Sequence, residues 1–410
     1  MTVPDVSVVI AVRNALPHLT DCLASLAAQT IGAGRMEVVA VDGGSTDGSG
    51  AELERFASLH PGLFRPHLPA GPRPEPTDRP EPTERTEPTD PADLGTARAH
   101  GRYVLYLGAQ DRLGPEALER LVAAADRLRS DVVLPLQVDG DGRELRRGVF
   151  ATGAEQVGFT DSALLWALTD AKLFRRELIT RYGLRRRPDL PVHADRPFTV
   201  AALLHAERIS VLADYGYYHR ARRPDPARRA PALDRLRGIR AVQEVVEQLT
   251  GPGPTRDAIR SRYFGWELPQ LLQQPFLALD GPEQRAVVRE IGRLVDRYCS
   301  PGLFVRLPVA DRLRLALAQR GELGALRGLI AHEAVHGPPP EVRRGGRRYA
   351  GYPVFRQVSP ALPDALFELP GGPAVRPPGW RRLVPRQVGR RARRWRRAWR
   401  DARPVKAAGS

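Results

Sequence analysis

One short turn near the amino terminus has the residue types and position of a ligand-binding loop. The run Asp42-Gly43-Gly44-Ser45-Thr46-Asp47 directly follows the apolar residues 38–41. The glycines leave room for a ligand against the backbone. Asp42 stands where the preceding segment ends. This turn is therefore the first candidate for a binding site.

The elements that would position this turn form a βαβ unit. Residues 6–14 are a β-branched apolar run that ends on polar residues, and residues 16–28 carry apolar side chains at helical spacing. Residues 38–41 form the second predicted strand. Ligands of such units gather where the parallel strands end, and Asp42 lies at that edge.

The segments "VSVVIAVRNALPHLTDCLASLAAQT" and "EVVAVDGGSTDGS" resemble the nucleotide-binding start of family 2 glycosyltransferases. The resemblance implies an α/β GT-A fold. It also implies that Ala11, Arg13 and Asn14 line the uracil pocket, and that Asp42 with Gly43 contacts the nucleoside of a UDP-sugar or another nucleotide sugar. A generic doubly wound α/β domain is the alternative.

The similarity is interrupted after the second strand and resumes at residues 94–107. Glu-Pro-Thr repeats every six residues within 70–92, and proline this frequent predicts a solvated, disordered or extended loop. "LGTARAHGRYVLYL" then resembles the family's next helix and buried strand. The arginine-asparagine pair that the family places just before has become Ala92 and Asp93.

The metal signature is also altered. Where the family has an aspartate-x-aspartate motif that holds Mn²⁺ or Mg²⁺, this chain has Gly108-Ala109-Gln110, followed by Asp111. Such cations want charged oxygen ligands, so the resemblance implies a weakened or lost cation site. Asp111 and His219 are the remaining candidate ligands, and Asp111 is also a candidate for donor binding. A helix-cap or loop role for Asp111 and a packing role for His219 are the alternatives.

Residues 192–198, "VHADRPF", resemble the family turn "EDxPF". By that resemblance Asp195 is the general base, ionised at a helix amino terminus, while the first acid of the turn has become Ala194. The alternative role for Asp195 is a simple helix cap.

Composition limits the classes to which the chain can belong. The 410 residues carry a formal charge of +16, almost entirely from arginine, since Lys172 and Lys406 are the only lysines. No run approaches eighteen apolar residues and no leader is apparent, so we expect a cytoplasmic protein that does not span the membrane. Cys22 and Cys299 are the only cysteines, so disulfide scaffolding and cysteine-held zinc are not expected.

Three parts are predicted. Residues 1–223 form the GT-A domain, residues 224–340 a helical domain and residues 341–410 a short β-like segment with a basic tail. Heptad-like apolar spacing predicts the helices of the second part over residues 233–249, 256–272, 282–298 and 308–331. In that tail Trp395 and Trp399 share one face of an arginine-rich helix, a pattern suited to an anionic membrane surface. A solvated tail and a nucleic-acid contact are the alternatives. No nucleic-acid fold accompanies the tail, and no nucleic-acid partner is expected.

The predicted function is transfer of a sugar from a nucleotide-sugar donor, by inversion, to an envelope polymer or a lipid-linked acceptor at the inner membrane face. The similarity to wall-teichoic-acid enzymes rests on the order of the GT-A and helical parts. Arg220 and Arg222 are expected to offset the diphosphate charge in place of a metal. The rival function is a catalytically degenerate GT-A domain that acts as a binding partner of an active enzyme.

Overall fold

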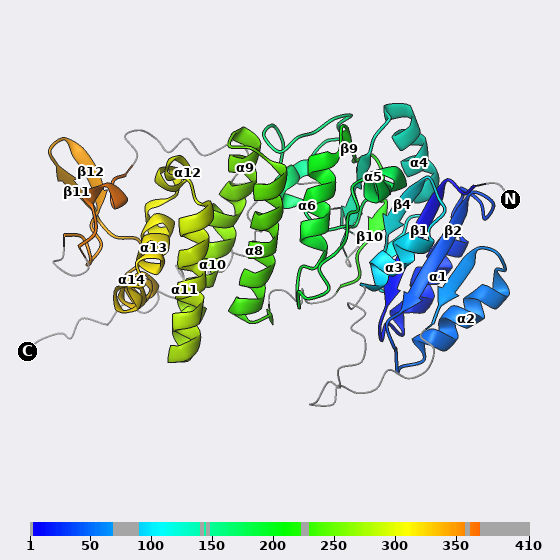
Figure 1. The fold of residues 1–410 in the computed structure, drawn as a ribbon, viewed down its shortest axis with the longest axis horizontal. Helices are drawn as coiled ribbons and strands as arrows, with labels where there is room; N and C mark the ends of the chain where they lie inside the picture. The colour runs from blue at the N-terminus through cyan, green and yellow to red at the C-terminus, as the bar shows by residue number, and fades with distance from the viewer. Residues whose placement is uncertain are drawn as a thin grey trace, which may run out of the picture. The chain divides into compact units, whose positions relative to one another are not determined.

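The computed structural model describes residues 3–68, 90–139, 143–144, 148–222, 229–356 and 361–369 (Figure 1). They lie in one compact unit, Met1–Gly371. The basic tail and nearly all of the Glu-Pro-Thr insertion fall outside the described residues, so the predictions made for them stay predictions.

A seven-stranded sheet in the order β3-β2-β1-β4-β8-β6-β9 forms the centre of the amino-terminal part. All neighbouring strands are parallel except β8, which runs antiparallel to both β4 and β6. This mixed α/β sheet confirms the predicted fold class. The strands are β1 Val6–Val12, β2 Met36–Asp42, β3 Phe64–His67, β4 Tyr103–Tyr106, β6 Val132–Pro135, β8 Leu173–Arg175 and β9 Ile209–Leu212.

Helices cover both faces of this sheet, which is why β2 is buried along its whole length. One core contains side chains of α1, α2 and α4, and a second core contains those of α3, α5 and α6. The second core continues without a break into the helices that follow the sheet. The helices are α1 His18–Ala27, α2 Ser49–Leu59, α3 Pro91–Arg98, α4 Ala117–Leu128, α5 Arg176–Arg181 and α6 Asp195–His205.

The helical part packs helix against helix: α6 on α8, α8 on α11, α11 on α13 and α13 on α14 (Figure 1). The helix predicted over residues 308–331 is in fact two helices, because Gly321 adopts a φ of 71° between them. A π-helical turn, Tyr263–Glu267, interrupts the helix predicted over 256–272. The helices are α8 Ala232–Leu249, α9 Pro254–Arg262, α10 Leu268–Leu271, α11 Gly281–Tyr298, α12 Pro301–Arg306, α13 Val309–Gln319 and α14 Leu323–His336.

Two small sheets complete the described part. The strands β5 Arg112–Leu113, β10 Tyr218–His219 and β7 Gln137–Val138 lie beside the carboxyl edge of the main sheet. The hairpin of β11 Glu341–Arg344 and β12 Arg347–Ala350 follows the helical part. Among the described residues, no helix combines the length and apolarity that crossing a membrane requires.

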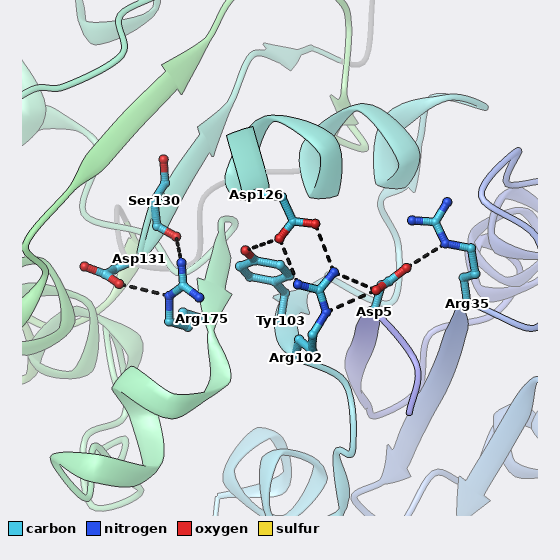
Figure 2. A network of polar contacts seen from close by, with 8 residues as sticks. All are labelled: Asp5, Arg35, Arg102, Tyr103, Asp126, Ser130, Asp131 and Arg175. Carbon is cyan, nitrogen blue, oxygen red and sulfur yellow. Dashed lines mark hydrogen bonds and ion pairs between the residues drawn. The ribbon is translucent and has the colours of Figure 1, made fainter. Parts of the chain in front are cut away.

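The amino edge of the main sheet is held by ion pairs (Figure 2). Arg102 donates to Asp5 at 2.6 Å and to Asp126 at 2.8 Å, and Arg35 donates to Asp5 at 2.6 Å. The Tyr103 hydroxyl donates to the same Asp126 carboxylate at 2.8 Å. These residues tie the starts of β1, β2 and β4 to α4, at the edge opposite the carboxyl ends of the strands.

Candidate active site

The sheet topology gathers the candidate residues at one edge. The parallel strands β2 and β4 end there, at Asp42 and just before Asp111. Because β8 runs the other way, the residues that enter it, Asp170 to Lys172, lie at this edge too. The helix α6 leads into parallel strand β9, so its first residue, Asp195, also begins there.

The predicted nucleotide-binding turn is braced by its own side chains. Asp42 is almost fully buried, and its Oδ1 accepts from the Ser45 N–H at 3.0 Å and the Ser45 hydroxyl at 2.6 Å. The Asn14 N–H donates to the Ser45 hydroxyl at 3.0 Å, and Asn14 Oδ1 accepts from the Thr46 N–H at 2.8 Å. These bonds join the loop after β1 to the loop after β2, as a shared pocket requires.

The other residues predicted for the nucleotide lie beside this turn. Ala11 and Arg13 are exposed at the end of β1, and Ala11 is in register with Val41 on β2. Gly43 donates its N–H to the Val12 carbonyl at 2.8 Å, which holds the two strand ends together. The structure thus brings Ala11, Arg13, Asn14, Asp42 and Gly43 together, and their role toward a nucleotide stays a prediction.

Asp111 is buried and connects the loop after β4 to β10. Its Oδ2 accepts from the Tyr218 hydroxyl at 2.8 Å, and its Oδ1 accepts from the Ala221 N–H at 2.9 Å. The Tyr218 oxygen in turn accepts from the Gly108 N–H at 3.0 Å. His219 Nε2 lies 3.0 Å from the Gly216 carbonyl oxygen within its own turn. Asp111 therefore braces the altered signature segment.

These donors do not fit a divalent cation. Both oxygens of Asp111 are engaged by neutral donors, and the signature positions Gly108, Ala109 and Gln110 offer no carboxylate. Within the part of the chain that the structure describes, no group of three or more His, Cys, Asp or Glu side chains could hold a metal ion. Mn²⁺ and Mg²⁺ require several oxygen ligands, usually with carboxylates among them.

A buried arginine occupies the centre of the edge instead. The Arg186 guanidinium donates to Asp93 at 2.9 Å and to Asp170 at 2.6 Å. The backbone N–H of Arg186 donates to the second carboxylate oxygen of Asp93 at 2.8 Å. Its guanidinium also lies 4.0 Å from the ring centre of Tyr106 and 4.4 Å from that of Phe198. Fixed by two carboxylates and two rings, Arg186 is a permanent positive charge in the site.

Asp195 is the first residue of α6, and its role as a general base stays a prediction. Ala194 occupies the N-cap of α6, with no side-chain capping bond, and Asp195 Oδ2 accepts from the Asp170 N–H at 3.3 Å. Burial, followed by the nearby Asp170 carboxylate, raises the pKa of Asp195 to about 6, while Arg196 and Arg186 oppose the rise. Burial and the neighbouring negative charge therefore make this carboxylate more basic than an ordinary aspartate.

Lys172 is buried beside these carboxylates. Its ammonium donates to the Thr169 carbonyl, and its side chain is almost wholly removed from solvent. Burial lowers the pKa of Lys172 to about 8, although the negative charges of Asp170 and Asp195 favour the protonated form. It is the only lysine within the described residues of a chain that otherwise uses arginine.

Sequence reasoning named neither Arg186 nor Lys172 as site residues. Arg186 and Asp93 are ninety-three positions apart in the sequence, so no local sequence pattern predicts their contact. Asp93 appeared in the sequence only as a departure from the family pattern. One feature of the sequence could have indicated Lys172 as a site residue: it is a lysine in an arginine-rich chain, and it stands directly before a strand.

Two family models match the sequence. The model described as glycosyl transferase family 2 matches residues 7–69, and the model described as glycosyl transferase TarS linker domain matches residues 234–330. The first covers the loops that carry Asn14 and Asp42. The second covers α8 to α13 and most of α14.

Curated relatives and solved structures agree with these matches. The poly(ribitol-phosphate) beta-N-acetylglucosaminyltransferase TarS of Staphylococcus aureus is 28% identical over 218 residues, which are 53% of this chain and 35% of that protein. The poly(ribitol-phosphate) beta-glucosyltransferase of Bacillus spizizenii is 28% identical over 221 residues, which are 53% of this chain and 32% of the relative. The chain thus aligns with about a third of each relative's length.

The crystal structure of S. aureus TarS 1–349 in complex with UDP-GlcNAc superimposes with a TM-score of 0.71 at 21% identity, over 84% of this chain and 96% of that one. At this identity the likeness shows the fold, and it extends through both the sheet and the helical part. The two family models and the fold agree with the resemblance seen in the sequence: residues 7–69 match the family 2 glycosyltransferase model on a GT-A fold, and residues 234–330 match the TarS linker model.

Proposed function

We propose that this protein transfers a sugar from a nucleotide-sugar donor, with UDP-sugars the first candidates, to a polyol-phosphate polymer of the cell envelope. The observation that carries the proposal is Asp195. It is buried at the start of α6, and the pKa of its carboxyl is raised to about 6. The relatives named above act on poly(ribitol-phosphate), which supports this class of acceptor.

In the proposed reaction Asp195 removes the proton from the acceptor hydroxyl as that oxygen attacks the anomeric carbon. A base works best when its pKa lies near the working pH, and burial moves Asp195 in that direction. The amino terminus of α6 favours the ionised form needed to accept the proton. Attack from the side opposite the departing diphosphate would invert the anomeric carbon.

The nucleoside would bind at the braced turn formed by Asn14 and Asp42. The resemblance to family 2 glycosyltransferases implies a divalent metal at the diphosphate, but the donors present here do not fit one. The diphosphate charge would instead be offset by arginine. Arg220 and Arg222 flank Ala221, whose N–H binds Asp111, and both arginines are exposed beside the signature loop. Their planar donors match phosphate oxygens.

We further propose that the reaction takes place at the cytoplasmic face of the membrane. The support is the arginine-rich sequence with Trp395 and Trp399, whose composition suits an anionic lipid surface. These residues lie outside the described part of the chain.

The deciding experiment is a transfer assay with poly(ribitol-phosphate) as acceptor and a panel of UDP-sugars as donors, run with EDTA and with Mn²⁺. Wild-type protein should transfer at least one sugar, and Asp195→Asn should abolish transfer while leaving calorimetric binding of UDP intact. Binding of UDP without any turnover would favour the rival, a non-catalytic binding domain, for which the altered signature at Gly108 to Gln110 is the motivating observation.

A further inference from the structure

The helical part makes a direct ionic contact with the helix that carries Asp195. Arg196, the next residue of α6, donates to the two carboxylate oxygens of Glu267 at 3.0 and 2.9 Å. Glu267 is the last residue of the π-helical turn between α9 and α10. Both side chains are mostly buried, so solvent screens the pair only weakly.

Glu267 also takes part in a series of contacts that leads back to Asp195, called the circuit below. Arg262 donates to Glu267 at 2.6 Å and, with its other nitrogen, to the Leu165 carbonyl. Leu165 lies a few residues before Asp170, whose N–H donates to the Asp195 carboxylate. The circuit therefore runs from α6 through the helical part and back to Asp195.

The π-helical turn places Glu267 at this point. Pro269 lacks an N–H, and its ring conflicts with the carbonyl four residues earlier in a regular helix. The wider turn at Tyr263–Glu267 accommodates the proline and projects Glu267 toward α6. Tyr263 is fully buried, and its hydroxyl has no hydrogen-bond partner among the described residues. Short π-helical turns frequently lie at functional sites, and an unpaired buried hydroxyl is a rare feature of folded proteins.

We infer that Arg196 and Glu267 are positioning residues of the base, and that through them the helical part sets the place and the charge environment of Asp195. The description of Asp195 as a base rests on the proposed function, whereas the effect of Arg196 and Glu267 on the place and charge environment of its carboxylate does not. The groups around Asp195 are Asp170, Lys172, Arg186, Arg196 and Tyr263, with Glu267 behind Arg196. His193 lies close enough to Glu267 to influence its charge.

Charge predicts opposite effects for the two partners. Arg196 lowers the pKa of Asp195, so Arg196→Gln should raise it. Glu267→Gln removes the negative charge that offsets Arg196, so the positive field at Asp195 grows and its pKa should fall. A shift of about 0.5 to 1 unit in each direction is expected for buried charges one contact away. The double variant should lie close to the wild type.

The test measures the Asp195 carboxyl directly by NMR titration of protein labelled with ¹³C-aspartate, with the resonance assigned from Asp195→Asn. Glu290→Gln is the matched control. It breaks the 3.0 Å pair with Arg240 on α8 and should leave the titration unchanged. Arg196→Lys keeps the charge and should titrate like the wild type, which covers the case in which a neutral variant fails to fold.

The acid limb of the pH dependence of kcat/KM should move in parallel with the titration. Shifts of both neutral variants in the same direction, or no larger than that of Glu290→Gln, would overturn the inference. Opposite shifts in a protein that transfers no sugar would leave the inference standing and reject the proposed function. The two failures are therefore distinguishable.

Discussion

Replacing Lys172 by methionine should make the protein more stable and less active. The ammonium is buried, and burial lowers the pKa of Lys172 from 10.5 to about 8. The unfolded chain therefore binds this proton more strongly than the folded protein does. A difference of 2.5 units corresponds to roughly 3 kcal/mol of free energy that the charged lysine costs the folded state near neutral pH.

The same lowering of the Lys172 pKa determines how the stability difference between wild type and Lys172→Met changes with pH. Between about pH 8 and pH 10.5 the folded protein has released the proton while the unfolded chain still holds it, so wild-type stability gains from rising pH. Methionine has no such dependence. Its advantage should fall from roughly 3 kcal/mol near pH 7.5 to roughly 1.5 near pH 9.5. Loss of the bond to the Thr169 carbonyl reduces both figures by about 1 kcal/mol.

Urea unfolding of wild type and Lys172→Met at the two pH values measures this difference, because titrating groups distant from Lys172 cancel between the two proteins and its neighbours Asp170 and Asp195 are carboxylates that do not titrate between pH 7.5 and pH 9.5. Lys172→Arg is the contrast: it keeps the charge but forces a larger head group into a nearly solvent-free place, and it should destabilise at both pH values. A methionine variant less stable than wild type at pH 7.5, or a difference that is equal at both pH values, would refute the reasoning. In the transfer assay the methionine variant should lose activity at neutral pH, since Asp195 loses a positive neighbour.

Four further predictions follow from the geometry. Asp195→Asn should abolish transfer yet stabilise the fold above pH 6 by up to about 3 kcal/mol, because a raised carboxyl pKa begins to cost stability as pH rises through the unfolded value of 3.8 and costs its full amount above the folded value of about 6. The gain should fall to roughly 0.5 kcal/mol near pH 4, and denaturant titrations at pH 4 and pH 7 test this. EDTA should leave initial rates unchanged, whereas Arg220→Ala with Arg222→Ala should raise the Kd for UDP measured by calorimetry; strict Mn²⁺ dependence would contradict this. Arg102→Ala, at the opposite edge of the sheet, should cost about 1 kcal/mol in urea unfolding without changing kcat. Removing residues 385–410 should abolish sedimentation with anionic vesicles and leave the melting temperature of the remainder unchanged.

Local pattern was enough to predict the first βαβ unit and the position of the braced turn. Strand, helix and strand lie close together in the sequence, and their buried faces have clear periodicity, so the predicted bounds of β1, α1 and β2 lie within two residues of the observed ones. The turn at Asp42 follows from the same pattern, because it lies where a parallel strand ends. Helix boundaries in the helical part were less accurate, since Gly321 and the π-helical turn interrupt an apolar spacing that looks continuous.

The charged centre of the site could not be predicted in the same way. Asp93, Arg186 and Asp170 come from three separate segments, and only the antiparallel entry of β8 brings the last of them to the carboxyl edge. The sequence showed that Gly108 to Gln110 lack the aspartates of the metal signature. It did not show that buried cations lie at the same edge of the sheet, because that proximity depends on the tertiary fold.

The loss of the metal signature and the buried cations are two parts of one arrangement. With no carboxylate at Gly108 or Gln110, the signature positions lack the charged oxygen ligands that a divalent ion requires. Arg186 and Lys172 then meet Asp93, Asp170 and Asp195, so that two cations face three carboxylates within the protein. Asp195 is the member whose carboxylate is least fully paired, since it accepts only one long backbone bond in this network and its pKa remains raised. Under the proposed function, Asp195 is therefore the carboxylate expected to take a proton from an incoming hydroxyl, because Asp93 is held by the Arg186 side chain and backbone.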